Sequence, residues 1–192
     1  MSGALCASLG QLTGLAVVHC SLSTAAPLDS SLSQLSLLRA LVCNETRLSP
    51  AACAVLRPLR SLTALHLSGC NLHGLSLGGC MRNLISLDIS CNPLDGPVPF
   101  EVTAASRLRA LAIDCRPDAA CGEGWEELRS RLLFLRCMEE LHLLDCCGCE
   151  GDTEAEALAA RLRVECGCMV ALNKQLSRHP VYGGLKWEDE DP

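Results

Sequence analysis

Cysteine is the residue type whose abundance first suggests chemistry, because the chain contains 15 cysteines among its 192 residues. Two short clusters near the C-terminal end hold five of them: Cys146, Cys147, Cys149, Cys166 and Cys168. Zinc in a structural site takes four thiolate or imidazole ligands, usually offered as pairs with two to four intervening residues. The C-x-C spacing within these clusters is too tight for the usual zinc knuckle. We therefore expect no metal or other cofactor, and a cysteine-based metal or redox-linked regulator stays an alternative.

Two segments with the same leucine spacing carry residues that also occur in hydrolase active sites. LTALHLSGCNL supplies His66 and Ser68, and LISLDISCNPL supplies Asp88 and Ser90. A nucleophilic hydroxyl needs an adjacent base, and a third group orients that base. His66 and Asp88 supply part of this arrangement, but no phosphate-binding glycine loop and no G-x-S-x-G elbow occurs in the chain. We predict that the protein is not an enzyme.

The elements that position these side chains follow from an internal repeat. The pattern L-x-x-L-x-L-x-x-N/C-x-L fits both segments, and weaker copies begin at residues 12, 38, 108 and 138, so that successive copies start 22 to 30 residues apart. Alternate side chains of the central x-L-x-L-x stretch point to opposite faces of a short strand. The ninth residue turns the chain, and an inward Asn or Cys there can pair with turn backbone groups that would otherwise be buried unpaired.

This spacing resembles that of the leucine-rich repeat family, and the resemblance covers residues 1–176. It implies an α/β solenoid with a curved parallel sheet on the concave face and helices and loops on the convex face. Residues 177–192 leave the pattern and are expected to form an acidic C-terminal tail. We expect strands near residues 15–17, 41–43, 65–67, 87–89, 111–113 and 141–143, with a truncated seventh strand near 169–173.

The segments between these strands differ in their helical character. Short helices are expected within 28–38 and 49–62, the second with Ser49 as its N-cap and Pro50 at its first position. The most strongly helical segments are 124–136 and 152–166. In these longer helical returns the C-terminal end resembles the ribonuclease-inhibitor class of repeats.

Composition narrows the classes of partner. A net charge of −6, with the 16 basic residues scattered, argues against nucleic acid, which requires clustered Lys and Arg. No apolar stretch approaches the roughly 18–20 residues that span a bilayer, and the first residues lack the features of a secretory signal. We expect a cytoplasmic protein whose cysteines are reduced and pack as small hydrophobes. Cys91 and Cys115 occupy equivalent positions of adjacent repeats, within disulfide reach if oxidised.

Function is expected in the residues that point outward from the strands, since the leucines are needed for stacking. The face they form contains small residues and acids, which favour Lys or Arg on a protein partner. The predicted partner-binding residues are Glu45, His66, Ser68, Asp88, Ser90, Asp114, His142 and Asp145.

The family resemblance implies a non-catalytic protein-interaction or scaffold module, expected to be a subunit of a larger intracellular assembly such as a cytoskeletal or ciliary one. An extracellular or cell-surface recognition domain is the alternative. The edge of the first strand is competent to pair, so we expect a partner or residues 1–11 to cover it.

Overall fold

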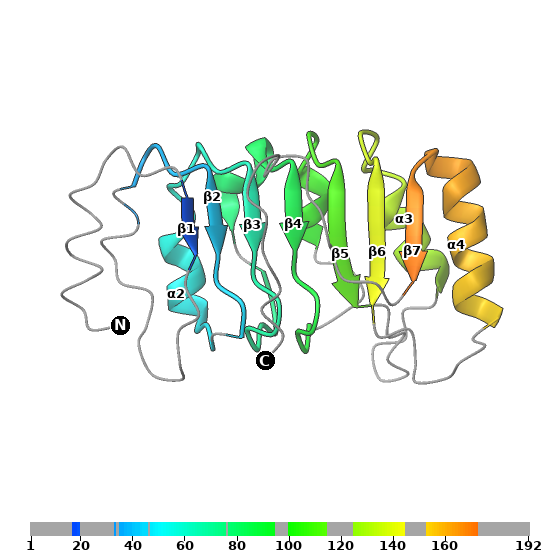
Figure 1. Ribbon diagram of the computed structural model, residues 1–192, viewed down its shortest axis with the longest axis horizontal. Helices are drawn as coiled ribbons and strands as arrows, with labels where there is room; N and C mark the ends of the chain where they lie inside the picture. Colours follow the sequence, from blue (N-terminus) through cyan, green and yellow to red (C-terminus); the bar gives the residue numbers. More distant parts are fainter. Residues whose placement is uncertain are drawn as a thin grey trace, which may run out of the picture.

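Seven strands form one sheet in which spatial order follows chain order (Figure 1). The computed structural model describes residues 17–19, 33, 35–45, 47–75, 77–94, 100–114, 125–144 and 153–172. All six strand pairings are parallel. The strands are β1 (Val17–His19), β2 (Ala40–Val42), β3 (Ala64–His66), β4 (Ser86–Asp88), β5 (Ala110–Asp114), β6 (Glu140–Leu144) and β7 (Met169–Leu172).

Most segments that return the chain between strands lie behind the sheet in the view of Figure 1, whereas α4 (Thr153–Cys166) stands beside β7 at the end of the sheet. The return segments contain three α-helices and two 3-10 helices within the described ranges: α2 (Pro50–Val55), η2 (Gly78–Asn83), η3 (Phe100–Ala104), α3 (Trp125–Leu132) and α4 (Thr153–Cys166). A parallel sheet with short returns on one side is the α/β leucine-rich repeat solenoid that the leucine spacing predicts. No helix in the described part of the chain is long and apolar enough to cross a membrane.

The observed element bounds differ slightly from the predicted ones. Strands β2, β3 and β4 each begin one residue before the predicted start. Strand β1 begins at Val17, two residues after its predicted start at residue 15. The earlier start has a hydrogen-bond cause: the amides of Thr63 and Ala64 both donate to the Arg39 carbonyl, at 2.8 and 3.0 Å. Helix α2 begins at Pro50 as predicted. The predicted helix within 28–38 lies almost wholly outside the described residues, as does the acidic tail, 177–192.

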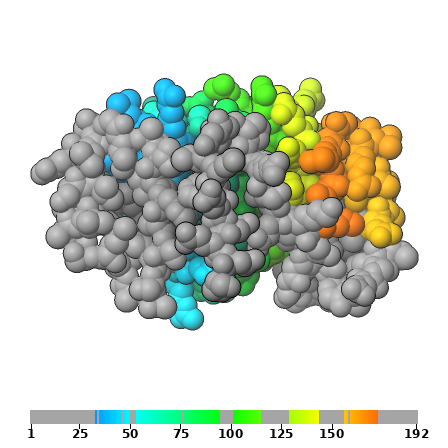
Figure 2. Space-filling view, in the orientation of Figure 1, coloured from blue at the N-terminus to red at the C-terminus, as the bar shows by residue number. Residues whose placement is uncertain are grey.

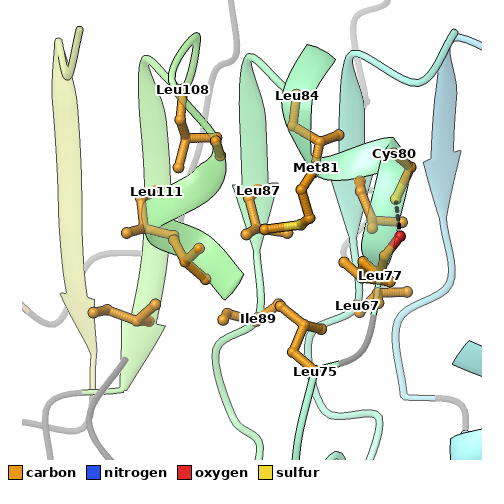
Figure 3. Packing of buried hydrophobic residues seen from close by; sticks show 14 of the residues in the cluster. Leu67, Leu75, Leu77, Cys80, Met81, Leu84, Leu87, Ile89, Leu108 and Leu111 are labelled. Carbon is orange, nitrogen blue, oxygen red and sulfur yellow. Dashed lines mark hydrogen bonds between the residues drawn. The ribbon is translucent and has the colours of Figure 1, made fainter. Parts of the chain in front are cut away.

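Leucines at the fourth position of each repeat form a continuous inner layer. Leu87 of β4 lies in register between Leu65 and Leu111, and all three are fully buried. Burial of one such side chain contributes about 2 kcal/mol. Figure 3 shows the return segments completing this core, with Leu77 and Met81 lying among the strand leucines. The inward face of every described strand from β2 to β6 is therefore occupied by packing.

The ninth-position residue satisfies backbone groups of the turns after β3 and β4, as the sequence predicts. Asn92 is 7 % exposed, and its Nδ2 donates to the carbonyls of Leu67, Ile89 and Ser90 at 2.8, 2.8 and 2.9 Å. Its Oδ1 accepts from the amide of Leu72 at 3.0 Å. Since Leu67 and Leu72 belong to the preceding repeat, one amide group joins two layers.

Replacement of this amide is predicted to destabilise the whole stack. Asn92→Ala leaves buried carbonyls without a donor and should lower the free energy of unfolding by about 3 kcal/mol. Cys70 occupies the same position one repeat earlier and donates to the Cys43 carbonyl. Because a thiol is a weak donor, Cys70→Ala should cost only about 1 kcal/mol. Urea unfolding of both variants measures the difference, and equal losses would contradict the assigned role of Asn92.

Candidate functional site

The outer sheet face is the side of the sheet turned away from the core, formed by the third and fifth positions of strands β2 to β6. Fourth- and sixth-position side chains belong to the core cluster, and alternation along a strand places the third and fifth on the opposite face. Five of these ten outward residues are small, apolar and no more than 6 % exposed: Ala40, Val42, Ala64, Ala110 and Ala112. The other five are polar, namely His66, Ser86, Asp88, Glu140 and His142, and three of them lie on β3 and β4.

Five polar residues gather on β3, β4 and the residues just after them: His66, Ser68, Ser86, Asp88 and Ser90, here called the β3–β4 polar cluster. His66 Nε2 and Ser86 Oγ lie 3.1 Å apart, and Ser68 Oγ and Ser90 Oγ lie 3.0 Å apart. Asp88 Oδ1 accepts from Ser90 Oγ at 2.6 Å and from the Ser90 amide at 3.0 Å. The side chains of this cluster therefore hold one another in place across two repeats.

Burial sets the protonation of the histidine in this cluster. His66 and Asp88 are register partners on β3 and β4. Burial lowers the pKa of the His66 ring, and the negative charge of Asp88 partly opposes that shift. His66 is therefore neutral at physiological pH, so one ring nitrogen donates a hydrogen bond and the other accepts one.

The contact between His66 and Ser86 has the separation of a base and a hydroxyl nucleophile. Ser86 is 0 % exposed, however. An acyl or phosphoryl group cannot reach its Oγ without displacing the residues around it. The geometry therefore supports a structural hydrogen bond between these side chains, and the half-buried His66, Ser68 and Asp88 are the members of the cluster that a partner can touch.

The rim beyond the strands is built from residues with left-handed backbone. Glu45 and Cys91 have φ of 54° and 56°, a region that side chains other than glycine occupy only when the surroundings enforce it. Asp114 enforces it at Cys91, because its Oδ1 accepts from the Cys91 amide at 2.8 Å and its Oδ2 from the Asn92 amide at 3.1 Å. Both Glu45 and Cys91 are exposed.

The predicted partner-binding residues separate into several groups. His66, Ser68, Asp88 and Ser90 come together in the polar cluster, although Ser90 is only 2 % exposed because its hydroxyl turns toward Asp88 and Ser68. Asp145 lies outside the described residues. Glu45 is exposed on the rim, whereas the carboxylate of Asp114 accepts hydrogen bonds from the neighbouring turn.

His142 differs from expectation, since an outward accessible ring was predicted. It is 6 % exposed, with its Nε2 at 3.8 Å from Glu140 Oε2. The register places it beside Ala112, two strands from Asp88. It is therefore neither accessible nor part of the polar cluster.

Ser86 is the member of the cluster that the sequence interpretation missed. The predicted partner-binding residues include no third-position residue, whereas the third position lies on the same face as the fifth because side chains alternate along a strand. The third position reads Ala40, Ala64, Ser86 and Ala110 in successive repeats. A single hydroxyl in this row of alanines was the signal that could have identified Ser86.

The cysteines have mixed environments. Eight cysteines in the described part of the chain are free thiols, and no group of three or more His, Cys, Asp or Glu there is arranged to hold a metal ion. Cys146, Cys147 and Cys149 lie outside the described residues, as does Cys115, the expected neighbour of Cys91. Burial raises the pKa of Cys80 to about 12, and its thiol donates to the Leu77 carbonyl at 3.2 Å, which suits a packing role.

The lowered pKa of His66 predicts a pH dependence of stability. The unfolded chain takes up a proton at the ordinary value, 6.5, while the folded ring resists it. Below that pH the unfolded state binds more protons, so the free energy of unfolding falls as the pH drops. His66→Gln, which keeps a neutral hydrogen-bonding side chain, should flatten this fall between about pH 7 and pH 5.

Urea unfolding at several pH values measures the slope for the wild type and for His66→Gln. His73→Gln, at an exposed histidine, serves as the matched control. Parallel curves for the wild type and His66→Gln would show that burial of the His66 ring has no energetic consequence.

Comparison with known proteins supports the repeat assignment at its centre. The Leucine Rich Repeat family model matches residues 61–82 and 83–104, which contain β3, η2, β4 and η3. No curated protein matches the chain. Leucine-rich repeat proteins generally mediate protein–protein interaction and are typically not enzymes.

Two solved structures, both from Listeria monocytogenes, are similar to the chain. An internalin (inlF) has a TM-score of 0.47 at 18 % identity, over 72 % of this chain and 44 % of that one. An internalin C2 (inlC2) has a TM-score of 0.43 at 16 % identity, over 84 % of this chain and 82 % of that one. The chain thus spans less than half the length of the first of these internalins.

Proposed function

We propose that the protein is a non-catalytic interaction or scaffold module that binds a protein partner through the β3–β4 polar cluster. The observation that carries this proposal is the set of mutual hydrogen bonds among His66, Ser68, Ser86, Asp88 and Ser90. Side chains already held in one arrangement lose little conformational entropy on binding. A group of polar side chains that is already held in place is a suitable recognition surface.

The chemistry of the surface favours a partner with Lys or Arg at its contact. Asp88 is half-buried and Glu45 is exposed on the neighbouring rim, and both carry negative charge at neutral pH. Complementary charge steers association and selects the partner. A nucleic-acid partner is not proposed, because the chain carries a net charge of −6.

We place this module in a larger intracellular assembly, including cytoskeletal or ciliary ones, and in the cytoplasm. Five of the eight described cysteines are buried, which suits a compartment where cysteines stay reduced and pack as small hydrophobes. A partner that covers the edge of β1 belongs to the same proposal, since β1 pairs with β2 alone in the described sheet. The likeness of the C-terminal end to the ribonuclease-inhibitor class also stays a proposal, supported by the 14 residues of α4.

Charge removal at Asp88 tests the binding site. Asp88→Asn keeps Oδ1 as an acceptor for Ser90 and removes the negative charge, so we expect unchanged folding and about tenfold weaker partner binding. Glu101→Gln is the matched control, because Glu101 is exposed on η3, on the other side of the sheet. Affinity capture with quantitative mass spectrometry compares the three proteins. Equal recovery of every captured protein on wild type and Asp88→Asn would contradict the proposal.

A free-thiol count tests the location. Cells are lysed in the presence of a thiol-alkylating reagent, and the intact mass of the purified protein is measured by mass spectrometry to count the alkyl groups. A cytoplasmic protein should carry an alkyl group on nearly all of its 15 cysteines. Alkylation of only a few cysteines, with the rest in disulfides, would instead support the extracellular alternative.

A further inference from the structure

Cys166 and Cys168 form a pair of neighbouring thiols at the junction of α4 and β7. Helix α4 ends at Cys166, and Gly167 follows with a φ of 67°, the left-handed conformation that commonly stops a helix. The two cysteines therefore flank a single left-handed residue, and each thiol affects the pKa of the other. A Cβ added at Gly167 would meet no heavy atom within 4 Å, so the outside of this turn is open.

The elements that carry the two cysteines are held by specific contacts. Arg129 of α3 forms a bidentate ion pair with Glu165. Its Nε and Nη2 each lie 2.7 Å from a carboxylate oxygen of Glu165. Arg163 Nη2 donates to the Val170 carbonyl of β7 at 2.8 Å. These contacts fix the last turn of α4 against both neighbours. Figures 1 and 2 show α4 and β7 side by side at the C-terminal end of the sheet, with atoms of both at the surface.

We propose that Cys166 and Cys168 are a dithiol–disulfide site whose oxidant is a small disulfide of the glutathione class. Disulfide formation requires two cysteines whose Cα and Cβ atoms are close, and only Gly167, at a φ of 67°, separates these two in the chain. The disulfide would close across a single residue between α4 and β7, at the last described strand of the sheet.

The two thiols differ in accessibility, which orders the steps. Cys166 is half-buried, whereas Cys168 is 5 % exposed and belongs to the core cluster. Cys166 releases its proton to solvent and attacks one sulfur of glutathione disulfide, forming a mixed disulfide and expelling one glutathione thiolate, which takes up a proton. The Cys168 thiolate, after losing its own proton, attacks Cys166 Sγ and expels the second glutathione. Two protein thiols are oxidised, and one glutathione disulfide is reduced to two thiols.

Burial also sets the rate of this reaction. Burial raises the pKa of both thiols, that of Cys168 to about 11. The thiolate is the attacking species, so the pair remains reduced and unreactive at neutral pH unless the oxidant is abundant. As long as the pH is below the pKa of the attacking thiol, the reaction rate should rise about tenfold for each unit by which the pH is raised.

Peptide mapping of the full chain tests the proposal. The protein is incubated with glutathione disulfide, remaining thiols are alkylated in denaturant, and the product is cleaved with trypsin. Cleavage after Arg163 and Lys174 releases residues 164–174, VECGCMVALNK, in which Cys166 and Cys168 are the only cysteines. The expected product is this peptide without alkyl groups and lighter by two hydrogen atoms, forming faster as the pH is raised from about 7 to about 9.

Single replacements separate the roles of the two thiols. Cys168→Ser should stop the reaction at the glutathione adduct of Cys166, and Cys166→Ser should leave Cys168 unmodified. Cys137→Ser, at an exposed cysteine outside the pair, is the control and should leave the internal disulfide unchanged. A wild-type peptide that stays doubly alkylated after Cys91 and Cys137 have reacted, carries two glutathiones, or is linked to another peptide would overturn the proposal.

Discussion

A single leucine-rich layer of this chain cannot bury its own side chains, and the rest of the structure depends on that constraint. Leu87 is fully buried because Leu65 and Leu111 flank it in register and the return segments close over it. Each layer is buried against its neighbours in the stack. The strands must therefore run parallel at nearly constant register, since a slip of one residue would turn the leucines outward.

The turns after the strands face a second demand, because stacked layers bury backbone polar groups at each turn. Asn92 meets it from within the stack, pairing with Leu67 and Leu72 of the preceding repeat. Asp114 meets it from the outside, holding the amides of Cys91 and Asn92. These lateral contacts also determine where the outward side chains stand. The β3–β4 polar cluster lies next to turns that are hydrogen-bonded to the repeats before and after them, and these bonds hold its side chains in position.

Sequence spacing predicted the parts of this structure that depend on one repeat at a time. The leucine positions, the turn role of Asn92 and the start of α2 at Pro50 all follow from local pattern. The contacts between repeats were harder to foresee. Asp114 has the appearance of a partner-binding acid in the sequence, yet its carboxylate caps the turn of the repeat before it. The burial of His142 and the pairing of Ser86 with His66 likewise depend on which side chains meet across neighbouring strands.

The separation of an inward stacking face from an outward recognition face is the central claim, and hydrogen exchange with a captured partner tests it most directly. Mass spectrometry of the free and bound protein reports which backbone amides become protected. We predict slower exchange in residues 66–69 and 88–91, around the polar cluster, and unchanged exchange in η2 and η3 behind the sheet. Protection confined to η2 and η3, with residues 66–69 and 88–91 unaffected, would contradict it.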